Sequence, residues 1–143
     1  MKKILFFSLI LLIGNSVFAS PKKPIAENQL PVAVKSFITK FFSQEKIATA
    51  MYEEELFDKE YKIILTDGSK LEFDKKGNCK EIKCKKNAIP MNVLPKKISN
   101  YINTHYANQS VVEYQKDKRE YEIKLQNGIE LVFNKNGEFT HFD

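Results

Sequence analysis

The chain has 143 residues, of which 23 are Lys or Arg and 18 are Asp or Glu, so its formal net charge is +5. A hydrophobic content of 43% is enough for a packed core and excludes a wholly disordered chain. Two cysteines exclude a disulfide-rich miniprotein and a four-cysteine zinc module. The length allows one ordinary domain or two very small ones.

The first 19 residues have the features of a secretory signal peptide. Two lysines precede an apolar run over residues 4–13, which is too short to span a membrane. Val17 and Ala19 suit the −3 and −1 positions of a cleavage site after Ala19, and an uncleaved membrane anchor is the alternative. Cleavage leaves 143 − 19 = 124 residues with a charge of 21 − 18 = +3. We therefore expect a periplasmic or secreted protein with no stable membrane insertion.

After a leader over residues 20–29, the sequence predicts a helix that begins near Pro31. Its apolar residues recur at helical spacing and form one stripe, which comprises Val34, Phe37, Ile38, Phe41 and Phe42. A strand is predicted over residues 47–52.

Strands with a period of two follow this helix. Tyr61, Ile63 and Leu65 alternate with polar or mixed neighbours, which is typical of a strand with one buried face. Asp67-Gly68 predicts a hairpin with a type I′ turn. The returning strand contains Leu71 and Phe73, and a last strand is predicted over residues 78–83.

The same pattern occurs a second time. At an offset of 60, nine of the 23 residue pairs that begin at positions 60–82 are identical, and at an offset of 64 the helical stripe recurs from Ile98 to Tyr106. The chain is thus predicted to contain repeat 1 over residues 30–84, a linker over 85–93 and repeat 2 over 94–143. The fold class is α+β, with two tandem helix-plus-antiparallel-sheet repeats and the helices on one face of the sheet. Because each repeat is marginal alone, the two are expected to share a sheet or a core.

The repeated Leu-Pro, helix and Tyr-x-Ile-x-Leu-x-[Asp/Asn]-Gly-x-x-Leu-x-Phe pattern resembles the bacterial PepSY-like family. Members are described as β-lactamase-inhibitor-like exported proteins, and the resemblance covers about Leu30 to Phe142. It implies tandem α/β repeats and export, but no known activity. Cys79 and Phe139 stand where the family often has tryptophan after the turn glycine.

The sheet face away from the helices is the candidate binding surface for a protein partner, because apolar residues on an open sheet face can mark a partner site, and the protein would act there as an inhibitor or modulator. Scattered exposed apolar residues are also normal on any surface, so an unremarkable or self-associating face is the alternative. Alternation along the strands places these candidates there: Ile64, Glu72, Lys124, Val132 and Phe139.

Lysines concentrate at the predicted junction between the repeats, opposite an acidic stretch over residues 53–60. They offer a second candidate function, which is binding of anionic envelope polymers. A solvated surface with complementary charge is the alternative. The candidate residues are Lys80, Lys83, Lys85 and Lys86.

Cys79 and Cys84 are the only cysteines, and export favours a disulfide between them. On one extended strand their Cα atoms would lie about 16 Å apart, so a bridge needs a bulge or turn between them. An internal disulfide and buried or intermolecularly paired thiols both stay open.

No catalytic, cofactor or metal motif occurs in the sequence. The acidic stretch lacks the loop of a calcium-binding hand, and His105 and His141 belong to no motif. We therefore expect a non-catalytic protein without cofactor or metal, and without nucleic acid as a partner.

Overall fold

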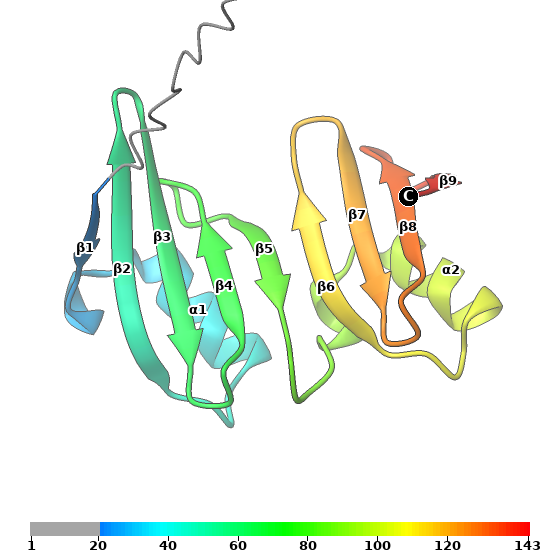
Figure 1. The fold of residues 1–143 in the computed structure, drawn as a ribbon, viewed down its shortest axis with the longest axis horizontal. Helices are drawn as coiled ribbons and strands as arrows, with labels where there is room; N and C mark the ends of the chain where they lie inside the picture. The colour runs from blue at the N-terminus through cyan, green and yellow to red at the C-terminus, as the bar shows by residue number, and fades with distance from the viewer. Residues whose placement is uncertain (1–20) are drawn as a thin grey trace, which may run out of the picture.

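The computed structural model describes residues 21–143, in which two α-helices and one antiparallel sheet of nine strands form an α+β fold (Figure 1). The strands are hydrogen-bonded in chain order from β1 to β9. The predicted signal peptide, residues 1–19, lies outside the described residues. The elements are β1 (Lys22–Pro24), α1 (Val32–Phe41), β2 (Ile47–Glu55), β3 (Asp58–Leu65), β4 (Lys70–Phe73), β5 (Cys79–Lys83), α2 (Lys96–His105), β6 (Val111–Lys116), β7 (Glu120–Leu125), β8 (Glu130–Asn134) and β9 (Phe139–Phe142), with short 3₁₀ turns at Glu27–Gln29 and Met91–Val93.

Both predicted helices form, and each begins directly after a proline. Pro31 precedes α1 and Pro95 precedes α2, where the fixed φ of proline suits the entry to a helix. The buried positions of each helix are four residues apart, Val34 and Ile38 in α1 and the corresponding pair in α2. Each helix therefore turns one narrow apolar stripe towards the sheet.

The core lies between the helices and one face of the sheet, and both helices appear behind the sheet in Figure 1. The ring of Phe37 in α1 contacts Phe73 in β4 edge-to-face, with 5.3 Å between centroids. Tyr101 in α2 makes the same contact with Phe133 in β8, also at 5.3 Å. These edge-to-face pairs are a favourable aromatic geometry and fix each helix over its own strands.

The two halves of the sheet meet where β5 pairs with β6. Three register pairs form this seam, with buried Ile82 opposite buried Tyr114 at its centre. The segment predicted as a linker also contacts β6, because the backbone N–H of Ile89 donates to the carbonyl of Val111 at 2.8 Å. Ile89 is buried, so part of the predicted linker belongs to the core.

The hairpin turns at Gly68 and Gly128 form where the sequence predicts them, but the predicted type I′ geometry is wrong. A type I′ turn needs positive φ at both central residues, and within residues 21–143 every positive φ belongs to a glycine. Gly68 has φ +86°, the N–H of Gly68 donates to the Leu65 carbonyl, and the N–H of Leu65 donates to the Ser69 carbonyl. This pattern fits a three-residue loop that ends in a left-handed glycine, and the Asp67 carboxylate accepts the Ser69 N–H.

An irregularity in register turns one side chain away from the face that simple alternation predicts. Between β8 and β9, Phe133 pairs with Phe139 while Val132 pairs with His141, so Thr140 is an extra residue. Phe139 consequently faces the helix, where its ring stacks on Tyr101 at 5.1 Å and 13°. The prediction that Phe139 lies on the open face is therefore wrong.

The residues predicted as a featureless leader contain strand β1, which pairs with β2 through three residues. Three residues are too few for a period of two to be recognised, so this strand could not be predicted. Within residues 21–143, no helix has the length and apolar character needed to cross a membrane.

Candidate functional site

The candidate site lies on the open sheet face, defined as the side of the sheet turned away from α1 and α2. Alternation along the strands places Ile64 and Glu72 on this face in the first half of the sheet, and Lys124 and Val132 in the second. Strands β5 and β6 lie between the two pairs. The four predicted residues therefore share a face without forming one cluster.

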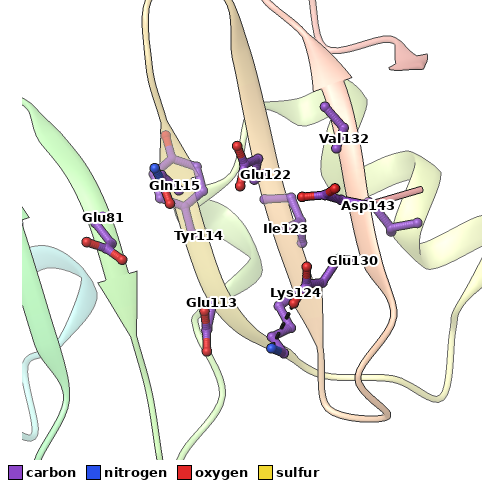
Figure 2. Close-up of a pocket in the computed structure, with 11 residues that line it drawn as sticks. Glu81, Glu113, Tyr114, Gln115, Glu122, Ile123, Lys124, Glu130, Val132 and Asp143 are labelled. Atoms are coloured by element: carbon purple, nitrogen blue, oxygen red, sulfur yellow. Dashed lines mark ion pairs between the residues drawn. The ribbon is translucent and has the colours of Figure 1, made fainter. Parts of the chain in front are cut away.

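A recess opens on this face in the second half of the sheet (Figure 2). It has a volume of about 60 Å³, far below the roughly 300–1,000 Å³ of sites for drug-sized ligands. A space of this size suits the end of one side chain. We call it the acidic recess, and its polar and floor residues are Glu81, Glu113, Gln115, Glu122, Ile123, Lys124, Glu130, Val132 and Asp143.

The acidic recess carries an excess of negative charge. Five carboxylates surround one amine, which gives −5 + 1 = −4. Lys124 pairs with Glu130 at 2.8 Å, and Glu81 pairs with Lys83 from the same strand. Among residues 21–143, the other three carboxylates form no ion pair, and they are Glu113, Glu122 and Asp143. The recess is therefore complementary to a cation.

Glu122 is the carboxylate that this arrangement most perturbs. Burial raises its pKa above the usual range, and repulsion from Asp143 and other nearby acids adds to the effect. Figure 2 shows Glu122 and Asp143 over the same part of the sheet. In the free protein the charged form of Glu122 is thus disfavoured, and a bound cation would relieve this cost.

We expect Glu122→Gln to stabilise the protein at neutral pH. Folding raises the pKa of Glu122. Its contribution to the stability of the folded protein is therefore most favourable below its pKa in the unfolded chain, and it declines as pH rises through its pKa in the folded protein. Thermal unfolding should therefore show a higher midpoint for the variant at pH 7 and no gain at pH 4. Glu27→Gln, at an exposed position in the first 3₁₀ turn, is the control. An equal gain at both pH values would contradict this prediction.

Val132 forms the floor of the recess. It points away from the helices, yet only 3% of its surface is exposed, and it lies opposite Glu122 and His141 in register. The expectation of an exposed apolar contact at Val132 is wrong, because neighbouring side chains cover it. Ile64 in the first half is 37% exposed and does present apolar surface.

The first half of the open face also carries an excess of acids, because Glu53, Glu55, Asp58 and Glu60 line a second recess with Lys62 as its one basic residue. Lys62 lies 2.8 Å from Glu53 and 3.6 Å from Glu72, and its hydrogen bond lowers the pKa of Glu53. Glu72 is therefore engaged within the sheet. Within residues 21–143, no three Asp, Glu, His or Cys side chains converge closely enough to hold a metal ion.

The predicted lysine cluster is divided by ion pairs. Lys80 pairs with Glu60 across the sheet, and Lys83 pairs with Glu81. Lys85 and Lys86 follow β5 in exposed positions and form no ion pair among the described residues. Two of the four predicted lysines are thus already neutralised, and the other two lie in the connection to α2.

Cys79 and Cys84 are both free thiols, so the internal disulfide is not formed. They lie at opposite ends of β5, and the Cys84 sulfur accepts a hydrogen bond from the buried Ser69 hydroxyl at 3.3 Å. Burial raises the pKa of Cys79 to about 12, which leaves little reactive thiolate at neutral pH. The alternative of buried thiols is the one that the structure supports.

Several residues of the recess were missed by the sequence analysis, namely Glu81, Glu113, Glu122 and Asp143. Strand alternation could have placed Glu122 on the open face, whereas Glu113 reaches that face through a register shift after Val111 that alternation does not predict. Alternation also could not have brought Glu81 beside them, because that depends on β5 pairing with β6.

Comparison with known proteins places the chain in a family. The family model described as "Putative beta-lactamase-inhibitor-like, PepSY-like" matches residues 59–141. The chain belongs to the PepSY-like family. The predicted resemblance is therefore confirmed.

Three solved structures of Bacteroides proteins share the PepSY-like fold of this chain. One from Bacteroides vulgatus is 42% identical, with a TM-score of 0.82, 85% of this chain and 96% of that chain covered, and is described as periplasmic. One from Bacteroides thetaiotaomicron, described as a "putative calcium-regulated periplasmic protein", is 38% identical, with a TM-score of 0.81 and the same coverage. Another B. vulgatus protein, periplasmic and of unknown function, is 35% identical over 86% of this chain and 99% of that chain, with a TM-score of 0.80. No curated protein matches the chain.

Proposed function

We propose that this PepSY-like protein is an exported, non-catalytic binding protein that holds a basic segment of a protein partner on its open sheet face. The observation that carries the proposal is the acidic recess, in which three carboxylates that form no ion pair within residues 21–143 surround a space the size of one side-chain end. A Lys or Arg side chain of the partner would enter the recess and pair with Glu113, Glu122 or Asp143.

The surrounding face supports a protein partner over a small molecule. One ion pair, Lys124–Glu130, lies in the recess, another, Lys62–Glu53, lies in the first half of the sheet, and Ile64 offers exposed apolar surface in that half. Non-obligate protein interfaces are about as polar as the rest of a protein surface, so a mixed face of this kind suits a protein partner. By binding its partner on this face, the protein would act as an inhibitor or modulator of that partner.

The periplasmic relatives support export, with residues 1–19 as the signal peptide. We also propose that residues 30–84 and 94–143 are two copies of one unit, since each helix is followed by four strands. Calcium, named for one relative, forms no part of the proposal, because no metal-holding cluster occurs within residues 21–143.

The test measures binding of labelled peptides by fluorescence anisotropy. We expect a peptide with adjacent Arg and Lys residues to bind, and an acidic peptide of the same length not to bind. Glu113→Gln and Glu122→Gln should each weaken binding about fivefold, or ~1 kcal/mol, and binding should fall as salt is added. Glu27→Gln is the control. Equal binding of both peptides, or no effect of either substitution in the recess, would overturn the proposal.

A second candidate function is binding of anionic envelope polymers at Lys85 and Lys86. The observation in its favour is that both lysines are exposed and form no ion pair within residues 21–143. Dextran sulfate is a suitable probe, and Lys85→Glu combined with Lys86→Glu should abolish its binding. Retained binding in this double variant would exclude the candidate.

A further inference from the structure

The two long hairpins of the sheet point towards the same end of the molecule. Strands β2 and β6 run in the same direction, because four successive antiparallel pairings connect them through β3, β4 and β5, and both turns lie at the top of Figure 1. We call residues 54–59 the first tip and residues 116–119 the second tip. Four strand spacings of about 4.8 Å place the two tips roughly 19 Å apart across the sheet.

The first tip is apolar at its end and acidic around it. Leu56 and Phe57 are 96% and 93% exposed, whereas the other large apolar residues of the described chain are less exposed. Three acids and one lysine in this tip give −3 + 1 = −2. Lys59 is turned back along the hairpin, with its Nζ 4.5 Å from the ring centroid of Tyr52. The end of the tip therefore presents two apolar side chains in an acidic setting.

The second tip has the opposite charge. Three bases and one acid give +3 − 1 = +2. The carboxylate of Asp117 is occupied within the turn, where it accepts the N–H groups of Arg119 at 2.6 Å and Glu120 at 2.9 Å. Lys118 and Arg119 are exposed and take part in no ion pair within residues 21–143.

The two tips are also complementary in length. The first hairpin spans residues 47–65 and the second 111–125, which is 19 against 15 residues. The four extra residues, divided between the two arms of the first hairpin, let the first tip project about 7 Å further. In a two-fold dimer, the long first tip of each copy can face the short second tip of the other copy. The two tip-to-tip contacts then have the same combined hairpin length, so both can form at once.

We propose that two copies of this chain associate around a two-fold axis, with the first tip of each copy against the second tip of the other. Leu56 and Phe57 would pack on the aliphatic stems of Lys118 and Arg119, and the guanidinium would lie over the Phe57 ring. Glu54 and Asp58 would pair with the same two basic residues. Such an interface is isologous and closes without leaving a tip unpaired.

The interface uses only hairpin ends, so its area falls in the range of weak, transient contacts. We expect a dissociation constant of roughly 10–100 µM at low salt. This dimer leaves the open sheet face unused, so it is independent of the partner binding proposed above.

Sedimentation velocity of the purified protein from 10 µM to 1 mM tests the proposal. A monomer–dimer equilibrium is expected in 20 mM salt, with at least tenfold weaker association in 500 mM salt. Leu56→Ser combined with Phe57→Ser should also weaken the association of the two copies at least tenfold. Because these side chains are exposed, circular dichroism and the thermal midpoint should stay unchanged.

Charge exchange supplies the decisive control. One variant carries Glu54→Lys and Asp58→Lys, so both of its tips are basic, and a second carries Lys118→Glu and Arg119→Glu, so both are acidic. Each variant should be monomeric alone, and a 1:1 mixture should form the dimer. A wild-type monomer at 1 mM, or association that the apolar substitutions leave intact, would overturn the proposal. Wild-type monomer that binds phosphatidylglycerol vesicles through Leu56 and Phe57 would overturn it in favour of a lipid surface.

Discussion

Replacing Phe133 by alanine is expected to lower the free energy of unfolding by about 3–5 kcal/mol. The Phe133 side chain is fully buried in β8 and contacts two rings edge-to-face, Tyr101 at 5.3 Å and Phe139 at 5.9 Å. Alanine would remove both contacts and leave a cavity between α2 and the sheet. The free energy of unfolding of a domain is typically about 5–15 kcal/mol, so this one substitution would remove a large part of the stability.

Urea denaturation followed by circular dichroism measures the effect, and Phe142→Ala is the matched control. Phe142 is also an aromatic residue of the second half, on the neighbouring strand, but 58% of its surface is exposed. We expect the control to cost less than about 1 kcal/mol, because most of its surface already contacts water. Similar losses for the two variants would show that Phe133 is not part of the packed core.

Gly77→Ala is expected to lower the free energy of unfolding by about 2–4 kcal/mol through two separate effects. Gly77 has φ +85°, where an L side chain is strained by about 1–2 kcal/mol. In addition, a Cβ at this position would lie 2.8 Å from the Cβ of Ala33 in α1, so the helix would have to move away from the sheet.

Gly68→Ala separates the two effects, because Gly68 has nearly the same φ of +86° and no atom within 4 Å of the added Cβ. This control should cost only the backbone strain. Gly137→Ala should fall between them, since its Cβ would lie 3.2 Å from the side chain of Lys97. In urea denaturation, the loss of free energy of unfolding is therefore expected to be largest for Gly77→Ala, smaller for Gly137→Ala and smallest for Gly68→Ala. Equal losses at Gly77 and Gly68 would refute the contact with α1.

The elements with a strong local pattern could be predicted from the sequence. Helical spacing of Val34 and Ile38, and alternation of Tyr61, Ile63 and Leu65, reflect burial of one side of each element, and these residues are buried. Such patterns depend only on neighbours along the chain. Local patterns consequently predict the helices and most strands, but not the three-residue strand β1.

The candidate site was harder to predict because it depends on register and strand order. An extra residue at Thr140 reverses the alternation in β9 and turns Phe139 to the helix, and no residue type in the segment signals this change. The recess needs Glu81 of β5 beside Gln115 of β6, two residues from different halves of the chain. Their proximity follows from the pairing at the seam, which local periodicity does not encode.

Strand β1 has a consequence for how the molecule behaves when concentrated. The neighbouring β2 has nine residues, and without a cover its outer edge would present a row of backbone groups on which another chain could add as a strand. Lys22, Lys23 and Pro24 occupy that edge instead, and all three are exposed. Two like charges repel an incoming strand, and proline lacks the N–H that pairing requires. The short leader strand thus protects the sheet from edge-to-edge aggregation.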